Sequence, residues 1–172
     1  APARAVDGSG ATPTVRAELA PWITLSRELD IGVPWMTHNR LTRDGALDAA
    51  VLVRIPLLAG EQVSTAGVQV ENGAIVAQLA RGEAELAWDA TLAEAPKVEL
   101  TAPTDQPWNE RWTLTCSPIW SCRASGLPPE SFGDGGTLQS RWSPRPGERL
   151  MVDLVRPAAA AGEGGGDLGS GH

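Results

Sequence analysis

Apolar and polar residues alternate with a period near two through the middle of the chain, which is typical of strands with one buried face. The clearest stretch covers residues 68–79 and is interrupted by Asn72-Gly73. A two-residue type I′ turn needs positive φ at both central positions, which Asn-Gly tolerates well. A turn there sets Val70 opposite Ile75 on one side of the sheet, so turn chemistry and hydrophobic pattern agree. We therefore predict a hairpin over 68–79.

Other short stretches show the same alternation or a compact apolar run, separated by Pro and Gly. They predict strands at 22–31, 35–42, 51–57, 83–88, 98–101, 111–115 and 150–155. We expect 51–57 to be buried on both faces, because apolar residues fill most of it. The segment 83–93 contains good helix formers and is the best helical alternative, but alternation at its start favours a strand. The whole pattern predicts an all-β fold, an antiparallel β-sandwich of immunoglobulin-like or jelly-roll-like type with little helix.

The two ends of the chain differ from this pattern. Residues 1–14 and 158–172 lack periodicity, and the second range is rich in Ala and Gly, so we expect flexible termini or linker there. We assign residues 15–157 to a single β-sandwich domain. The first residue is Ala, and no signal-peptide pattern precedes it. This indicates that a signal was removed or that the chain was cut from a longer protein.

Composition excludes several classes of protein. The hydrophobic content of 42% argues against a disordered chain. No apolar run approaches the roughly 20 residues of a membrane span. The net charge is -7, and the 14 basic residues are scattered and outnumbered by 21 acidic ones. A nucleic-acid binder usually has a basic patch or stripe, so we expect no nucleic-acid partner.

The chain has two cysteines, Cys116 and Cys122. In one straight strand they would lie about 20 Å apart, whereas a disulfide needs Cα atoms within about 7 Å. A bond between them therefore requires a chain reversal, which Ser117-Pro118 can start. We expect a structural disulfide in an oxidising compartment, with two buried free thiols as the alternative. Redox catalysis and a zinc site are disfavoured, because the spacing is not C-x-x-C and no second Cys or His pair exists.

Seven tryptophans supply most of the aromatic residues. Most lie inside predicted strands, which favours core packing, while an exposed set would form a sugar-stacking platform. The candidate ligand-stacking residues are Trp108, Trp120 and Trp142. We expect Trp108 to be exposed, because it lies beside Pro107 in a polar stretch. Trp142 lies between two arginines and could stack with a guanidinium group.

No coherent set of catalytic residues emerges. His38 is the one histidine outside the tail, no G-x-S-x-G elbow exists, and we expect His38 on a strand surface. Glycosidase-like carboxylate pairs could be drawn from Glu83, Glu85, Asp89, Glu94 and Glu99, but acidic residues are too common here to single out a pair. Asp134-Gly135-Gly136 lacks the EF-hand pattern, and phosphate-binding Gly-rich motifs are absent. We therefore expect no enzyme activity, no cofactor and no metal.

Six short segments carry a family resemblance. They are, in order, 55–61 (IPLLAGE), 66–73 (AGVQVENG), 100–103 (LTAP), 116–120 (CSPIW), 125–129 (SGLPP) and 142–148 (WSPRPGE). In this order the chain resembles the extracytoplasmic part of large, uncharacterised proteobacterial membrane proteins. The resemblance implies a bacterial periplasmic setting and a membrane anchor outside this chain. It supplies no catalytic residue.

These observations lead to a non-enzymatic, extracytoplasmic β-sandwich module of a larger membrane-anchored envelope protein, with a structural or protein-binding role. Its expected partners are other domains of the same membrane protein or other envelope proteins, and exposed strand edges would be the natural contact surface. The alternative is a carbohydrate-binding module that uses exposed tryptophans to bind glycan.

Overall fold

Every regular element that the structure describes is a strand. The structure is a computed structural model that describes residues 23–45, 48–132 and 138–156. The largest sheet has seven strands, in the order β12 (Ser131–Phe132), β13 (Leu138–Trp142), β10 (Asn109–Cys116), β2 (Ile23–Ile31), β3 (Met36–Arg43), β8 (Glu85–Leu92) and β5 (Glu61–Val63). This confirms the prediction of an all-β fold.

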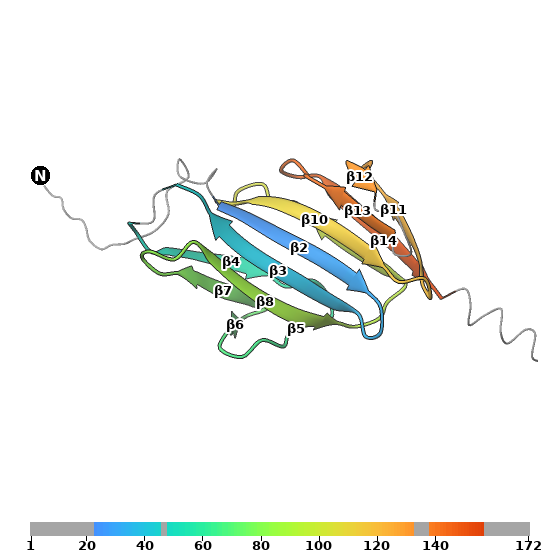
Figure 1. Ribbon diagram of the computed structural model, residues 1–172, viewed down its shortest axis with the longest axis horizontal. Coiled ribbons are helices and arrows are strands. Elements are labelled where there is room, and N and C mark those ends of the chain that lie inside the picture. The colour runs from blue at the N-terminus through green and yellow to red at the C-terminus, as the bar shows by residue number, and fades with distance from the viewer. Residues whose placement is uncertain (1–22, 46–47, 133–137, 157–172) are drawn as a thin grey trace, which may run out of the picture.

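Two three-stranded sheets lie on one side of the large sheet (Figure 1). The first has the order β11 (Ser121–Ser125), β14 (Arg149–Val155) and β9 (Lys97–Thr101). The second has the order β4 (Val51–Pro56), β7 (Ala74–Leu79) and β6 (Gln69–Glu71). All pairs are antiparallel except β2 with β10, which run parallel. The predicted sandwich therefore has a mixed sheet in one layer and two small antiparallel sheets in the other.

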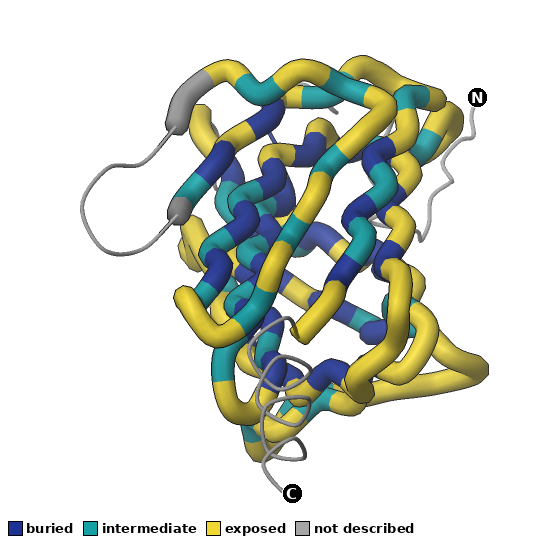
Figure 2. The backbone as a smooth tube through the Cα atoms, turned by 90° about the vertical axis from the view of Figure 1, so that its right-hand side faces the viewer, coloured by how far each residue is buried: buried dark blue, intermediate teal, exposed yellow. Residues whose placement is uncertain are grey.

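Alternation along the strands creates two hydrophobic cores, one under each small sheet. Figure 2 shows buried and exposed residues alternating along the backbone, as one-sided burial requires. One half of β2 and the sheet of β9, β11 and β14 enclose the first core, whose largest members are Trp35, Trp112 and Trp142. The other half of β2 and the sheet of β4, β6 and β7 enclose the second, with Trp88 and Trp108.

The hairpin predicted at Asn72-Gly73 is present. Asn72 has φ 50° and Gly73 has φ 75°, as a type I′ turn requires. The register pairs Val70 with Ile75, as expected from the hydrophobic pattern. Ile75 is buried, whereas Val70 remains 44% exposed because β6 is the outer strand of its sheet.

The other predictions for single strands had mixed outcomes. The segment predicted at 83–88 is strand β8, so the helical alternative is wrong. The expectation that 51–57 is buried on both faces is also wrong: β4 alternates strictly, and Leu52 is 55% exposed. The reason is that β4 belongs to an outer sheet with solvent on its far side. The sequence did not indicate strands β5, β11, β12 and β13, which are short or follow Gly- and Pro-rich segments.

The disulfide between Cys116 and Cys122 is confirmed, with Cα atoms 6.4 Å apart. The predicted reversal is a turn in which the Trp120 N–H donates to the Ser117 carbonyl at 3.0 Å. Cys116 ends β10 in the large sheet, and Cys122 lies on β11 in a small sheet. The bond therefore ties the two layers together where the chain crosses between them.

Candidate functional site

Strand β9 has an open edge. It pairs with β14 on one side and ends its sheet on the other. The Ala102 N–H donates to the Glu148 carbonyl, and the Leu154 N–H donates to the Pro96 carbonyl, each at 2.9 Å. Because ladder bonds alternate in an antiparallel pair, residues 98 and 100 also face β14. The peptide groups of residues 97, 99 and 101 consequently point to the open edge.

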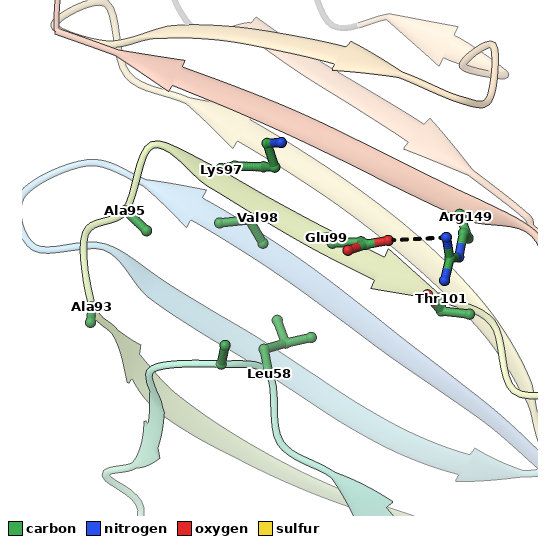
Figure 3. A pocket seen from close by; sticks show the side chains of 9 residues that line it. Leu58, Ala93, Ala95, Lys97, Val98, Glu99, Thr101 and Arg149 are labelled. Atoms are coloured by element: carbon green, nitrogen blue, oxygen red, sulfur yellow. Dashed lines mark ion pairs between the residues drawn. The ribbon is translucent and has the colours of Figure 1, made fainter.

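A groove runs along this edge. It has a volume of about 420 Å³ and is lined by Leu58, Ala59, Ala93, Ala95, Lys97, Val98, Glu99, Thr101 and Arg149. Figure 3 shows Leu58 and Val98 extending into the space between β9 and the facing loop. Alanines make up much of the opposite side, which leaves room for side chains other than those of this chain. The groove thus combines open peptide groups with an apolar floor and small-residue walls.

The wall of the groove opposite β9, formed by residues 58–60 and 93–95, is held by local hydrogen bonds. The Ala93 N–H donates to the Gly60 carbonyl at 3.0 Å, and the Glu61 N–H donates to the Leu58 carbonyl at 3.0 Å. Gly60 has φ +81°, and a Cβ there would lie 3.0 Å from the Ala93 Cβ, so glycine is required at this position. The Glu61 carboxylate also accepts from the Leu58 N–H at 2.8 Å.

Glu61 in turn belongs to a buried polar network between the two cores. The Arg27 guanidinium lies 3.8 Å from the Glu61 carboxylate and 3.5 Å from that of Glu110, and all three side chains are at most 8% exposed. The Thr37 hydroxyl donates to Glu61 at 2.5 Å. Arg27 also donates to the Pro56 carbonyl at 3.0 Å, just before the loop that forms the wall. The network therefore connects the centre of the large sheet to the groove.

The rim of the groove carries both signs of charge. An oxygen of the Glu99 carboxylate lies 3.6 Å from the Arg149 guanidinium, and Arg149 is 71% exposed (Figure 3). Lys97 faces Asp153 across the ladder. No carboxylate of the described residues lies within 4.0 Å of the Lys97 ammonium. Lys97 is therefore the cation on this rim that is most available to a partner.

The three candidate stacking tryptophans do not form a platform. Trp108 is 4% exposed and Trp142 is 2% exposed, so the expected exposure of Trp108 is wrong. The reason is Glu110, whose carboxylate accepts from the Trp108 indole N–H at 2.9 Å and lets this ring enter the core. Trp120 is half-buried, packs edge-to-face on Trp35 at 5.0 Å and lies under the Arg156 guanidinium. A guanidinium contact of the kind considered for Trp142 is present at Trp120, and the Trp142 N–H donates to the Leu127 carbonyl.

His38 lies on β3, on the face of the large sheet away from the cores, as expected. Its Nδ1 is 2.9 Å from the Asp89 carboxylate and its Nε2 is 3.1 Å from that of Asp30. The hydrogen bond to Asp89 is the main cause that raises the pKa of His38 above 6.5; partial burial lowers it, and the bond to Asp30 raises it further. An imidazolium donates to both carboxylates at once, so this arrangement favours an ionic link across β2, β3 and β8.

The other acidic residues weighed for hydrolysis lie in separate local contacts. Glu85 lies 3.4 Å from the Arg40 guanidinium, and Glu83 accepts from the Ala80 N–H at 2.7 Å. Among residues 23–45, 48–132 and 138–156, no group of three His, Cys, Asp or Glu side chains could hold a metal ion. Asp134-Gly135-Gly136 and Trp22 lie outside the described residues. Within the described part of the chain, no helix is long and apolar enough to cross a bilayer.

Sequence reasoning predicted the strand at 98–101 but not the groove beside it. Neither the open edge of β9 nor the approach of residues 58–60 and 93–95 follows from the local pattern. One signal was available: Lys97 is the single lysine and alternates with Glu99 on one strand face. Charged residues in this arrangement are typical of edge strands.

Comparison with known proteins assigns no family to this chain. No protein-family model matches the chain, and no curated protein matches it. Among solved structures, the chain is similar to an M1 zinc metallopeptidase mutant from Deinococcus radiodurans bound to a Tyr-Ser-Ala substrate. The similarity has 16% sequence identity and a TM-score of 0.41, and covers 76% of this chain but only 40% of that one. At this level the match carries no argument about function.

Proposed function

We propose that this chain is a non-enzymatic, extracytoplasmic protein-binding module of a larger membrane-anchored envelope protein, and that it receives an extended segment of its partner as an added strand along β9. The observation that carries the proposal is the open edge at residues 97, 99 and 101 beside the groove of about 420 Å³. Main-chain hydrogen bonds to an exposed edge are a common mode of peptide recognition.

The other sheet edges offer less. Strands β5 and β6 have three residues each and β12 has two, and short edge strands are a usual protection against pairing. Strand β4 ends in Pro56, whose carbonyl accepts from Arg27. Strand β11 is restrained by the disulfide at Cys122. β9 has five residues, and the groove of about 420 Å³ runs along its open edge.

The disulfide supports the extracytoplasmic setting, because such bonds persist in oxidising compartments and are rare in the cytosol. The membrane-anchored architecture rests on the family resemblance. The buried state of Trp108 and Trp142 counts against the glycan-binding alternative, which needs accessible ring faces.

The proposal is tested with a capped, fluorescent nonapeptide of alternating Thr and Val, titrated against the full chain and followed by anisotropy. We expect saturable binding that is lost in Glu99→Pro, since proline removes the outward N–H while leaving the ladder to β14 intact. Glu99→Gln is the matched control and should keep binding. N-methylation of every second peptide N–H should abolish binding when the methylated groups are those that face β9. Methylation of the alternate set, which faces away from β9, should leave binding intact. Equal binding by both Glu99 variants, or no binding by any peptide, would overturn the proposal.

A further inference from the structure

The groove beside β9 also constrains the residue pattern and the charge of the segment that binds there, and this inference rests on the proposed function. We infer that the occupant is an extended segment of a partner protein that alternates apolar with polar residues and places an acidic side chain opposite Lys97. An added strand would have two faces, one toward the groove floor and one toward solvent, and each face constrains the side chains of the occupant.

The inward face of an added strand would contact apolar groups. Residues opposite Val98 would point to the same side as Val98, which is 7% exposed and belongs to the first core. Leu58 packs against that core from the other wall (Figure 3). A polar side chain placed between these two would lose water without gaining a hydrogen bond. Every second residue of the occupant is therefore apolar.

The wall also limits the occupant to a single strand. The loop at 58–60 and the residues at 93–95 face β9 across the groove and are fixed by the Ala93–Gly60 and Leu58–Glu61 hydrogen bonds. A folded sheet that docked through its own edge would need room for further strands beyond the first. A linear segment of a partner fits this geometry, whereas the strand edge of a second folded domain does not.

The outward face of an added strand determines which charged side chain the occupant can carry. Residues of the occupant opposite 97 and 99 would lie beside those side chains at the distance of cross-strand pairs, where opposite charges attract. Glu99 already has the Arg149 guanidinium at 3.6 Å. Lys97 faces Asp153 across the ladder to β14, but its ammonium has no carboxylate within 4.0 Å among the described residues. A carboxylate on the occupant is thus best placed opposite Lys97.

The experiment uses three capped nonapeptides, Thr-Val-Thr-Val-X-Val-Thr-Val-Thr, with X as Glu, Gln or Lys. For the wild-type chain we expect the Glu peptide to bind roughly two- to fivefold more tightly than the Gln peptide, with the Lys peptide weakest. Lys97→Glu should reverse the order, and Lys97→Met should remove the preference. Arg123→Glu is a matched control on β11, which is the far edge of the same sheet, and should leave the order unchanged.

The outcomes separate the two proposals. If all three peptides bind equally to the wild-type chain and to Lys97→Glu, yet fail to bind Glu99→Pro, the charge inference is overturned while strand addition stands. If the order changes equally in Arg123→Glu and Lys97→Glu, the preference comes from net charge and the inference is again overturned. If no peptide binds, or Glu99→Pro binds as well as Glu99→Gln, the proposed function itself fails.

Discussion

Replacing Arg27 by Met should be among the most destabilising single changes in the large sheet. Its guanidinium is the cation next to the carboxylates of Glu61 and Glu110, and all three side chains are at most 8% exposed. Removing one partner of a buried ion pair typically costs about 3–5 kcal/mol, because the remaining charge is left without compensation. In Arg27→Met, two buried carboxylates, those of Glu61 and Glu110, would lose their cation.

Hydrogen bonds that remain reduce the cost. Glu61 would keep the Thr37 hydroxyl at 2.5 Å, and Glu110 would keep the indole N–H groups of Trp108 and Trp112 at 2.9 and 2.8 Å. We therefore expect a loss near the lower end of the range, about 3 kcal/mol in the free energy of unfolding. For a domain of this size that corresponds to a fall in Tm of roughly 10 °C.

The assay is urea denaturation followed by tryptophan fluorescence and circular dichroism, with linear extrapolation. The matched control is Arg54→Met, since Arg54 forms an exposed pair with Glu71 at 3.3 Å. A surface pair contributes at most about 1 kcal/mol, so this variant should stay close to wild type. A loss below about 1 kcal/mol for Arg27→Met, or equal losses for the two arginines, would refute the role assigned to the buried network.

Three further predictions concern the disulfide, the histidine and the hairpin. Replacing both Cys116 and Cys122 by Ala should lower the free energy of unfolding by about 2 kcal/mol, as expected for a small closed ring, measured by urea denaturation. An NMR titration should place the pKa of His38 above 6.5, and Asp89→Asn should lower it, because the main hydrogen-bond acceptor loses its charge. Gly73→Ala should cost about 1 kcal/mol, because Gly73 has φ +75° while its Cβ would meet no atom within 4 Å.

Each of these has its own control. Reducing the wild-type disulfide should reproduce the loss seen in the double Ala variant; an unchanged unfolding midpoint would contradict the stabilising role of the bond. Gly32→Ala places a Cβ 3.9 Å from its nearest neighbour without a positive φ, so it should cost less than Gly73→Ala. Equal costs would argue against backbone conformation as the cause.

The histidine also makes stability depend on pH. Because its pKa is raised in the folded state, the stabilisation from charged His38 is fully present below the unfolded value near 6.5 and is lost as pH rises through the folded pKa. The charged groups facing it are Asp30 and Glu28 on β2, Asp89 on β8 and Arg40 on β3. The difference in free energy of unfolding between wild type and His38→Gln should therefore shrink as the pH rises from about 6.5 past the folded pKa of His38. A difference that grows with pH would show that the sign is wrong.

Local chemistry made part of this fold predictable. The hairpin followed from Asn72-Gly73 because turn type and register are both set within a few residues. The disulfide was the expected state of the single cysteine pair, and distance added that the bond needs a chain reversal, because one straight strand would hold Cys116 and Cys122 too far apart. Trp108 was wrongly predicted to be exposed because its sequence neighbours are polar. The sequence does not show that the Glu110 carboxylate points inward and accepts the Trp108 indole N–H.

Long-range contacts were not predictable in the same way. The parallel pairing of β2 with β10 joins residues more than 80 positions apart, and no local pattern encodes it. The groove also depends on a long-range contact: Leu58 and Val98 are far apart in the sequence and line it together because the second layer places β9 beside the loop that follows β4. The sequence indicates a strand at β9, but whether its edge is paired is decided by the order of strands in the sheet.

The most direct test of strand addition is amide hydrogen exchange, measured residue by residue by NMR with and without a saturating concentration of the Thr/Val nonapeptide. An added strand would hydrogen-bond the outward peptide groups of β9. We predict slower exchange at the amides of Lys97, Glu99 and Thr101, with those of Val98 and Leu100 little changed because they already bond to β14. Unchanged exchange at the first three amides while the peptide is bound would contradict the account.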